Sequence, residues 1–102
     1  MKQSGEVTQT FLQFILMQTQ QALFALGKHP NMPPTAPPPN LNLGKMYVDH
    51  LVMLRIKTEG NLSMEETNAL NNAIGVLQGA LTDAMKEAEE GRSAVREMEE
   101  EE

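Results

Sequence analysis

Residues 57–66 read "KTEGNLSMEE", and this stretch decides how the chain is organised. Gly60 and Asn61 both tolerate the positive φ with which helices commonly end. Ser63 and Glu66 then form the S-x-x-E pattern of a capping box, in which each side chain accepts a hydrogen bond from the backbone amide of the other residue. The stretch therefore predicts a hinge between two helices, and we favour this interpretation over a reactive loop.

Apolar residues at helical spacing lie on both sides of this hinge. They predict a helix over about 42–59 and another over 64–90. The apolar positions of these two helices are Leu43, Met46, Tyr47, Leu51, Leu54, Leu70, Ile74, Leu77 and Leu81. Beyond position 90 the glutamates oppose the dipole at a helix C-terminus. Residues 91–102 are therefore predicted to form an acidic tail with weaker helical order.

A third helix is predicted over residues 7–27, before the other two in the chain. Its apolar residues surround much of its circumference. Gly27 stands where a left-handed C-cap belongs, and Pro30 forbids continuation of the helix. Residues 1–6 before this helix are expected to be flexible. The helix is followed by a connector over 29–40.

The connector "HPNMPPTAPPPN" holds all six prolines of the chain. This composition favours a stiff, extended, polyproline-like spacer, which Asn40 or Asn42 can end by capping the next helix. The tetrapeptide "PTAP" and the P-x-x-P spacing are alternatives, since they look like ligands of proline-reading domains. We favour the spacer.

Length, charge and cysteine content exclude several classes of protein. A chain of 102 residues makes one domain. The absence of Cys removes disulfides, thiolate nucleophiles and zinc–thiolate sites, and it fits a reducing compartment. The formal charge of −6 is concentrated in 86–102, where eight glutamates face three basic residues. The other basic residues are scattered, which argues against nucleic-acid binding.

No segment predicts a membrane span. The longest apolar stretch, "FLQFILM" at 11–17, is interrupted by Gln13 and is far shorter than the roughly 20 residues that a span requires. The start of the chain also lacks the small-residue cleavage site of a secretory signal. We therefore expect a cytoplasmic protein.

Three stretches carry a family resemblance. "QALFALG" at 21–27, "YVDHLVML" at 47–54 and the hinge stretch at 57–66 resemble the small bacterial family called domain of unknown function 1844. The resemblance covers roughly residues 8–85, and the K-T-x-G-N-L core is its most specific part. The chain departs from the family pattern at His50 and Arg55, in its longer proline run and in the end of its last helix. The resemblance implies a small helical bacterial protein without a known activity.

Few residues are candidates for chemistry. Asp49 is interpreted either as an ion-pair partner of Lys45 or Lys57, or as a buried carboxylate in a ligand cleft. Lys57, near the start of the last helix, is a weak candidate for anion binding, because Glu65 and Glu66 already occupy that helix end. No H-E-x-x-H or E-x-x-H spacing occurs, so we expect neither a metal nor a cofactor.

The sequence as a whole predicts an all-α, three-helix arrangement, a helical hairpin plus one helix, completed by homo-oligomerisation with a dimer favoured. Gly75 and Gly79 form G-x-x-x-G, whose cost in helix propensity implies close approach of another helix, from the same chain or from a second copy. The predicted interface residues are Phe11, Phe14, Ile15, Ala22, Leu26, Gly75 and Gly79.

The function favoured by these patterns is a non-enzymatic, cytoplasmic interaction or assembly module, with a protein partner as a further expectation. The alternative is a binding module whose apolar groove, between the first two helices, accepts a partner helix or a small ligand. A third and weaker hypothesis is an enzyme that uses Asp49.

Overall fold

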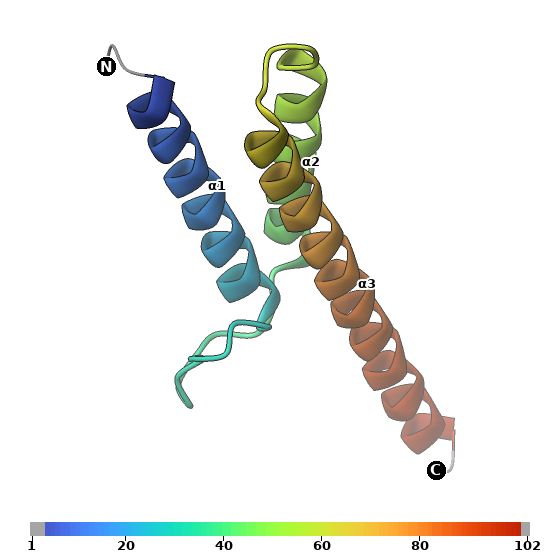
Figure 1. The fold of residues 1–102 in the computed structure, drawn as a ribbon. Helices are drawn as coiled ribbons and strands as arrows, with labels where there is room; N and C mark the ends of the chain where they lie inside the picture. The colour runs from blue at the N-terminus through green and yellow to red at the C-terminus, as the bar shows by residue number, and fades with distance from the viewer. Residues whose placement is uncertain (1–3, 101–102) are drawn as a thin grey trace.

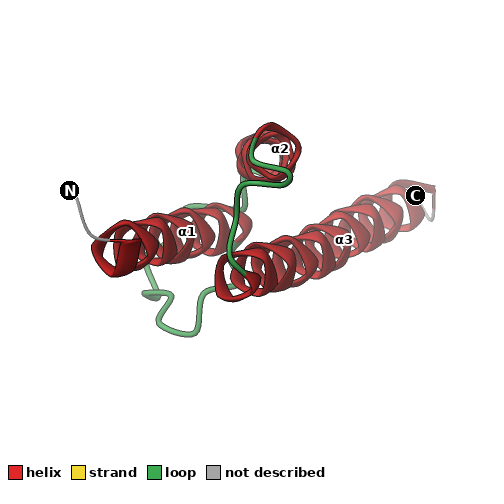
Figure 2. Ribbon diagram, turned by 45° about the horizontal axis from the view of Figure 1, so that its top comes forward, coloured by secondary structure: helices red, strands yellow, loops and turns green. Residues whose placement is uncertain are grey.

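The computed structural model describes the backbone of residues 4–100 and the side chains of residues 5–93. Three helices follow one another: α1 (Ser4–Leu26), α2 (Leu41–Lys57) and α3 (Met64–Glu100). Each helix packs against the other two, and the described residues contain no strand. This confirms the predicted all-α, three-helix arrangement. α1 and α3 run in the same direction and α2 runs opposite to both (Figure 1), while α2 lies over the junction of α1 and α3 (Figure 2).

The end of α1 is a Schellman motif. Gly27 has φ 71°, its amide donates to the carbonyl of Phe24 at 3.1 Å, and the Lys28 amide donates to the carbonyl of Leu23 at 2.8 Å. The predicted C-cap at Gly27 is therefore confirmed. At the other end, the helix begins at Ser4, so part of the segment 1–6 that we expected to be flexible is helical, while residues 1–3 lie outside the described residues.

The connector between α1 and α2 is not the extended spacer that the sequence predicted. The Ala36 amide donates to the carbonyl of Pro33 at 3.0 Å, which closes a turn inside the proline run and folds the segment back on itself. Figure 1 shows it as a loop that leaves the helices and returns. Proline at the second position of a turn is favoured, because its φ is already set, and Pro34 occupies that position. The turn also breaks the polyproline conformation that a P-x-x-P ligand needs.

Two hydrogen bonds fix the point at which the connector becomes α2. The Asn40 side chain accepts from the Leu43 amide at 3.0 Å, which makes Asn40 the N-cap. The Asn40 amide donates at 2.7 Å to the carbonyl of Ala25, one of the last carbonyls of α1 that have no partner within the helix. The start of α2 is thereby attached to the end of α1.

The hinge between α2 and α3 has the predicted capping box. The Ser63 amide donates to Oε1 of Glu66 at 2.8 Å, and the Glu66 amide donates to Oγ of Ser63 at 3.1 Å. Gly60 has φ 81°, whereas no other described residue except Gly27 has positive φ. Asn61 thus takes an ordinary conformation, and its amide donates to the carbonyl of Thr58 at 2.9 Å. The interpretation of this stretch as a hinge thus accounts for Gly60, Ser63 and Glu66.

Replacing Ser63 by alanine should lower the free energy of unfolding by about 1 kcal/mol, because the Glu66 amide loses its acceptor. Urea unfolding of the full chain measures the change. Ser93→Ala, on the exposed surface of α3, is the matched control and should have an effect within about 0.5 kcal/mol. Equal stability of Ser63→Ala and the wild type would contradict the capping role.

The core lies where the three helices meet. Its buried residues are Ile15, Ala22, Val48, Leu51, Leu70, Ala73, Ile74 and Leu77. Beside this cluster, Leu26 is completely buried and packs against Gly44. A Cβ atom at position 44 would lie 2.2 Å from Cδ2 of Leu26, so only glycine fits there. α1 and α2 therefore pack tightly against each other at Gly44, a position that the sequence pattern did not single out.

α3 continues beyond the predicted end near residue 90 and reaches Glu100. Most residues after Gly91 are good helix formers, and the Arg92 side chain pairs with Glu89 at 2.9 Å across that glycine. The helix thus extends well past α1 and α2, and the molecule measures 67 × 27 × 16 Å. The acidic side chains at 97–102 lie outside the described residues.

Candidate functional site

The distribution of charge separates one segment of α1 and one segment of α3 from α2. Residues 7–26 of α1 and residues 67–82 of α3 include no Asp, Glu, Lys, Arg or His. α2 is shorter, yet it carries Lys45, Asp49, His50, Arg55 and Lys57. Solvent-exposed helices normally present charged residues on their outer side. The outer sides of residues 7–26 and 67–82 present glutamine, asparagine, threonine and apolar residues instead.

Two contacts show that the uncharged segments lie side by side. Near the start of α1, the Thr8 side chain lies close enough to the Glu66 carboxylate, at the start of α3, to lower its pKa. Just after the end of α1, Nζ of Lys28 forms an ion pair with Oε1 of Glu87 at 2.6 Å. Along the direction of the helix axes, residue 8 therefore lies at the same height as residue 66, and residue 28 lies at the same height as residue 87. Between these contacts, the middle of α1 lies beside residues 74–76 of α3.

One side of each uncharged segment faces α2. Phe14 of α1 lines a groove with Met53 of α2, and Asn71 of α3 lines a hollow with Arg55 of α2. Successive residues on a helix are about 100° apart. Leu16 therefore points about 160° away from Phe14, and Val76 points about 140° away from Asn71. Leu16 and Val76 must lie on the face that is opposite α2.

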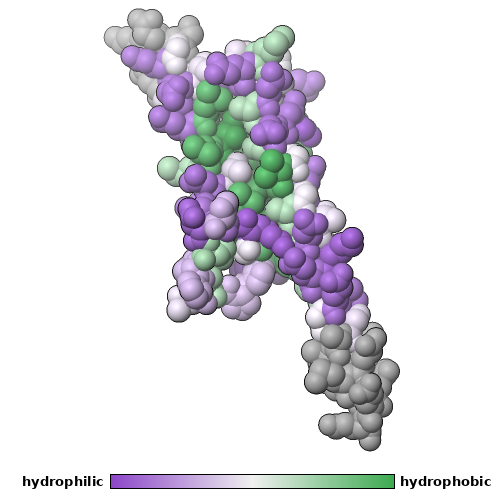
Figure 3. Space-filling view, turned by 60° about the horizontal axis from the view of Figure 1, so that its bottom comes forward, coloured by the Kyte–Doolittle hydropathy of each residue, from purple (hydrophilic) through white to green (hydrophobic). Residues whose placement is uncertain are grey.

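We call this surface the α1–α3 face; its residues are Leu12, Leu16 and Leu23 of α1, and Ala69, Val76 and Ala80 of α3. Leu16 is 58% exposed and Val76 is 46% exposed. The other four are half-buried. Figure 3 shows apolar side chains gathered over α1 and α3, with polar side chains around them. The α1–α3 face is thus an apolar, uncharged surface on the outside of the chain.

The groove between α1 and α2 has a volume of about 270 Å³. Phe14 and Gln18 line it from α1, and His50, Leu51, Met53 and Leu54 line it from α2. Phe14 is 48% exposed and Met53 is 49% exposed, so the apolar lining is open to solvent. This is the second apolar surface of the chain.

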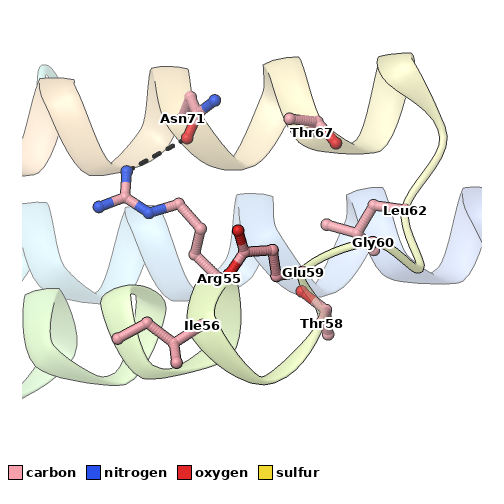
Figure 4. Close-up of a pocket in the computed structure, with 8 residues that line it drawn as sticks. All are labelled: Arg55, Ile56, Thr58, Glu59, Gly60, Leu62, Thr67 and Asn71. Carbon is pink, nitrogen blue, oxygen red and sulfur yellow. Dashed lines mark hydrogen bonds between the residues drawn. The ribbon is translucent and has the colours of Figure 1, made fainter.

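A second hollow, of about 310 Å³, lies at the hinge and is shown in Figure 4. Nη1 of Arg55 donates to Oδ1 of Asn71 at 3.2 Å across its mouth. The hydroxyl of Thr58 donates to the carbonyl of Leu54 at 2.7 Å, which engages it in ending α2. Three of the polar side chains that line this hollow are therefore engaged in hydrogen bonds within the chain: Arg55, Asn71 and Thr58.

Comparison with known proteins addresses the resemblance noted in the sequence. The family model described as Domain of unknown function (DUF1844) matches residues 8–83, which is most of the chain. The chain belongs to this family. No curated protein and no solved structure matches it significantly. The chain is thus a small helical domain of the DUF1844 family, to which no function is assigned.

The DUF1844 match contains both apolar surfaces and the hinge, because it runs from residue 8 of α1 to residue 83 of α3.

Among the described residues, no helix is long and apolar enough to cross a membrane. Nor do the described side chains include three His, Cys, Asp or Glu that gather as metal ligands would.

The structure sorts the predicted interface residues of α1 into two groups. Ile15, Ala22 and Leu26 are at most 4% exposed and belong to the interior of this chain, so their assignment to an interface is wrong. Phe11 is half-buried against the core, and Phe14 is exposed beside α2. The apolar pattern of the DUF1844 helix was recognised correctly, but its spacing did not show which positions its own chain covers.

Gly75 and Gly79 of the DUF1844 chain are both exposed, and a Cβ atom at either would meet no described atom within 4 Å. The explanation by a close helix of the same chain is therefore wrong. Close approach of a second copy stays a prediction. Gly79 lies three residues after Val76 and so borders the α1–α3 face. Gly75, four residues before Gly79, lies on the same side of α3 as Gly79 but points farther away from Val76.

Asp49 and Lys57 do not come together in a site. Asp49 is exposed on α2, so the interpretation as a buried carboxylate in a ligand cleft is wrong. The ion pairs among the described residues join Lys28 to Glu87 and Arg92 to Glu89, and neither includes Asp49 or Lys57. Lys57 is exposed at the last position of α2.

Glu66 is the one buried charged residue of the described part of the DUF1844 chain. The hydrogen bond from the Ser63 amide lowers the pKa of the Glu66 carboxyl below its ordinary value, against the opposing effect of burial. The side chains of Ser63 and Thr8 also lower this pKa. The ionised carboxylate is thus the form that joins the capping box to α1.

Stability should therefore depend on pH through Glu66. Because the folded state lowers this pKa, the contribution is present above the ordinary glutamate pKa of about 4.3 and is lost as the pH falls through the lowered value. We expect Glu66→Gln to be less stable than the wild type at pH 7 and nearly as stable at pH 3. Urea unfolding at both values measures the difference. A difference that does not shrink toward acid pH would contradict this role.

Proposed function

We propose that this DUF1844 domain is a non-enzymatic, cytoplasmic assembly module that associates with a second copy of itself through α1. The observation that carries the proposal is the outer surface of α1, which is free of charge over 20 residues and leaves large apolar side chains exposed. These are Val7, Phe14, Leu16, Met17 and Phe24. Depletion of charge together with aromatic residues and methionine is the composition of an interface core.

Three further observations support the proposal. The candidate catalytic residue, Asp49, is exposed on α2 and lines neither the α1–α2 groove nor the hinge hollow. Three polar side chains of the hinge hollow, those of Arg55, Asn71 and Thr58, are engaged in hydrogen bonds within the chain. The cysteine-free composition fits a reducing compartment. These observations support a binding surface rather than a reaction site.

Sedimentation equilibrium of the full chain tests the proposal. We expect a mass twice the 11.3 kDa of one chain at micromolar concentration, and a melting temperature that rises with protein concentration because association stabilises the folded state. A mass of one chain throughout the measured concentrations would contradict it.

The groove between α1 and α2 supports a second candidate function, the binding of a small apolar ligand or a partner helix. Its lining, with Phe14, Met53 and Leu54, is open and mainly apolar. An apolar fluorescent dye that brightens on binding is a suitable probe. If the groove is a binding site, Met53→Glu should abolish dye binding, whereas Ile56→Glu, at another exposed position of α2, should leave it unchanged. Equal binding by the two variants would exclude the groove.

A further inference from the structure

We infer that two copies of the chain associate through the α1–α3 face as an antiparallel two-fold dimer, with the axis passing close to Leu16 and Val76. This inference rests on the self-association proposed above and specifies its surface and geometry. Leu16 and Val76 are the most exposed residues of the α1–α3 face, and α2 lies on the opposite side of both helices.

The charge distribution favours a second copy as the occupant of this face. The chain carries a net charge of −6, most of it in residues 86–102, so two copies repel each other where these segments approach one another. Residues 7–26 and 67–82 form the part of the structure where two copies can meet without bringing like charges together. A basic partner would gain no electrostatic attraction from this face, since it offers no acidic group.

The size of the face fits a small dimer. Twenty residues of helix extend about 30 Å, and two adjacent helices with axes 8–10 Å apart cover a width of about 20 Å. The footprint is therefore on the order of 600 Å² per chain, or about 1,200 Å² in total, which is the lower end of the range for specific interfaces. Around Val76, the small residues Ala69, Gly79 and Ala80 leave room for another helix to come close.

The position of α1 relative to α3 along the helix axes determines where the two-fold axis can pass. The contacts of Thr8 with Glu66 and of Lys28 with Glu87 set Leu16 beside residues 74–76. A two-fold axis perpendicular to the helices can therefore pass close to Leu16 and Val76 together. Each would then face its own counterpart in the second copy.

The acidic end of α3 favours a two-fold axis perpendicular to the helices over one parallel to them. An axis parallel to the helices would put the two segments 86–102 side by side, each with eight glutamates and three basic residues. An axis perpendicular to the helices directs them to opposite ends of the dimer. Since like charges repel, the antiparallel arrangement is favoured.

A charge-swap at the axis is the sharpest experiment. Leu16→Glu and Leu16→Lys each place two like charges opposite each other across the axis. Each variant alone should raise the dissociation constant about 100-fold or more. An equimolar mixture of the two should regain a dimer, because the mixed pair is Glu opposite Lys. Sedimentation equilibrium of the full-length variants measures this, and circular dichroism checks that each retains its helix content.

Matched variants separate this face from the α1–α2 groove. Met53→Glu places the same charge at a similarly exposed apolar position on α2 and should leave the dissociation constant within about threefold of the wild type. Because the chain has no cysteine, Leu16→Cys should form an intermolecular disulfide under mild oxidation, whereas Ile56→Cys should not.

The outcomes distinguish this inference from the proposed function. A monomeric wild type overturns both. A dimeric wild type that Leu16→Glu leaves intact, or that Met53→Glu dissociates, overturns the α1–α3 face and retains self-association. Separate monomers in the charge-swapped mixture overturn the position of the axis. Dissociation by each Leu16 variant, with recovery in the mixture, supports the antiparallel dimer.

Discussion

Replacing Gly44 by valine should lower the free energy of unfolding by about 3 kcal/mol. The added Cβ would lie 2.2 Å from Cδ2 of Leu26 and 2.6 Å from its Cγ, and Leu26 has no exposed surface into which it can move. α1 and α2 would have to separate, or Leu26 would have to leave its rotamer. Either change disturbs the tight contact between α1 and α2. Urea unfolding at a concentration below any association measures the effect.

Gly75→Val is the matched control, because a Cβ there meets no described atom within 4 Å. It should change the stability by no more than about 0.5 kcal/mol, since valine is at least as good a helix former as glycine. Leu26→Ala provides a second check. Combined with Gly44→Val it should cost less than the sum of the two single changes, because the valine then occupies part of the space that Leu26 vacates. Strict additivity would refute the close contact.

Truncating Leu77 to alanine should cost about 3–4 kcal/mol. Leu77 is completely buried in the core where all three helices meet, so the change removes apolar contacts and leaves a cavity. For a domain of this size that is a large part of the total stability. Thermal and urea unfolding should both show it.

Met85→Ala, two turns further along α3, is the control for this prediction. Met85 is 53% exposed, so its truncation should change the stability by no more than about 0.5 kcal/mol. Similar losses for the two variants would mean that the core does not lie where the structure places it.

The features of the fold that depend on neighbouring residues could be predicted from the sequence. A capping box needs two residues three positions apart, and a Schellman motif needs a glycine just after an apolar helix. Ser63, Glu66 and Gly27 therefore revealed their roles directly. The turn within the prolines was also present as a signal in Pro34, but the number of prolines obscured it.

Features that depend on residues distant in the sequence could not be predicted in this way. Gly44 requires Leu26 as its neighbour, and no local pattern joins the two. The apolar positions of α1 surround much of the helix, so spacing alone could not separate buried Ile15 from exposed Leu16. The α1–α3 face became evident only once α2 was known to cover the other side. The absence of charged residues from 7–26 and 67–82 was nevertheless visible in the sequence and indicated this face.

The hydrogen bond from the Asn40 amide to the Ala25 carbonyl has a consequence for how the chain can vary. It holds the two ends of the proline loop together, so the helices do not depend on what lies between them. Lengthening such a closed loop costs only about 0.6 kcal/mol for each doubling of its length. Insertions should be tolerated here far better than at the hinge of α2 and α3, and a foreign peptide or a small tag introduced near Thr35 should be displayed without disturbing the fold.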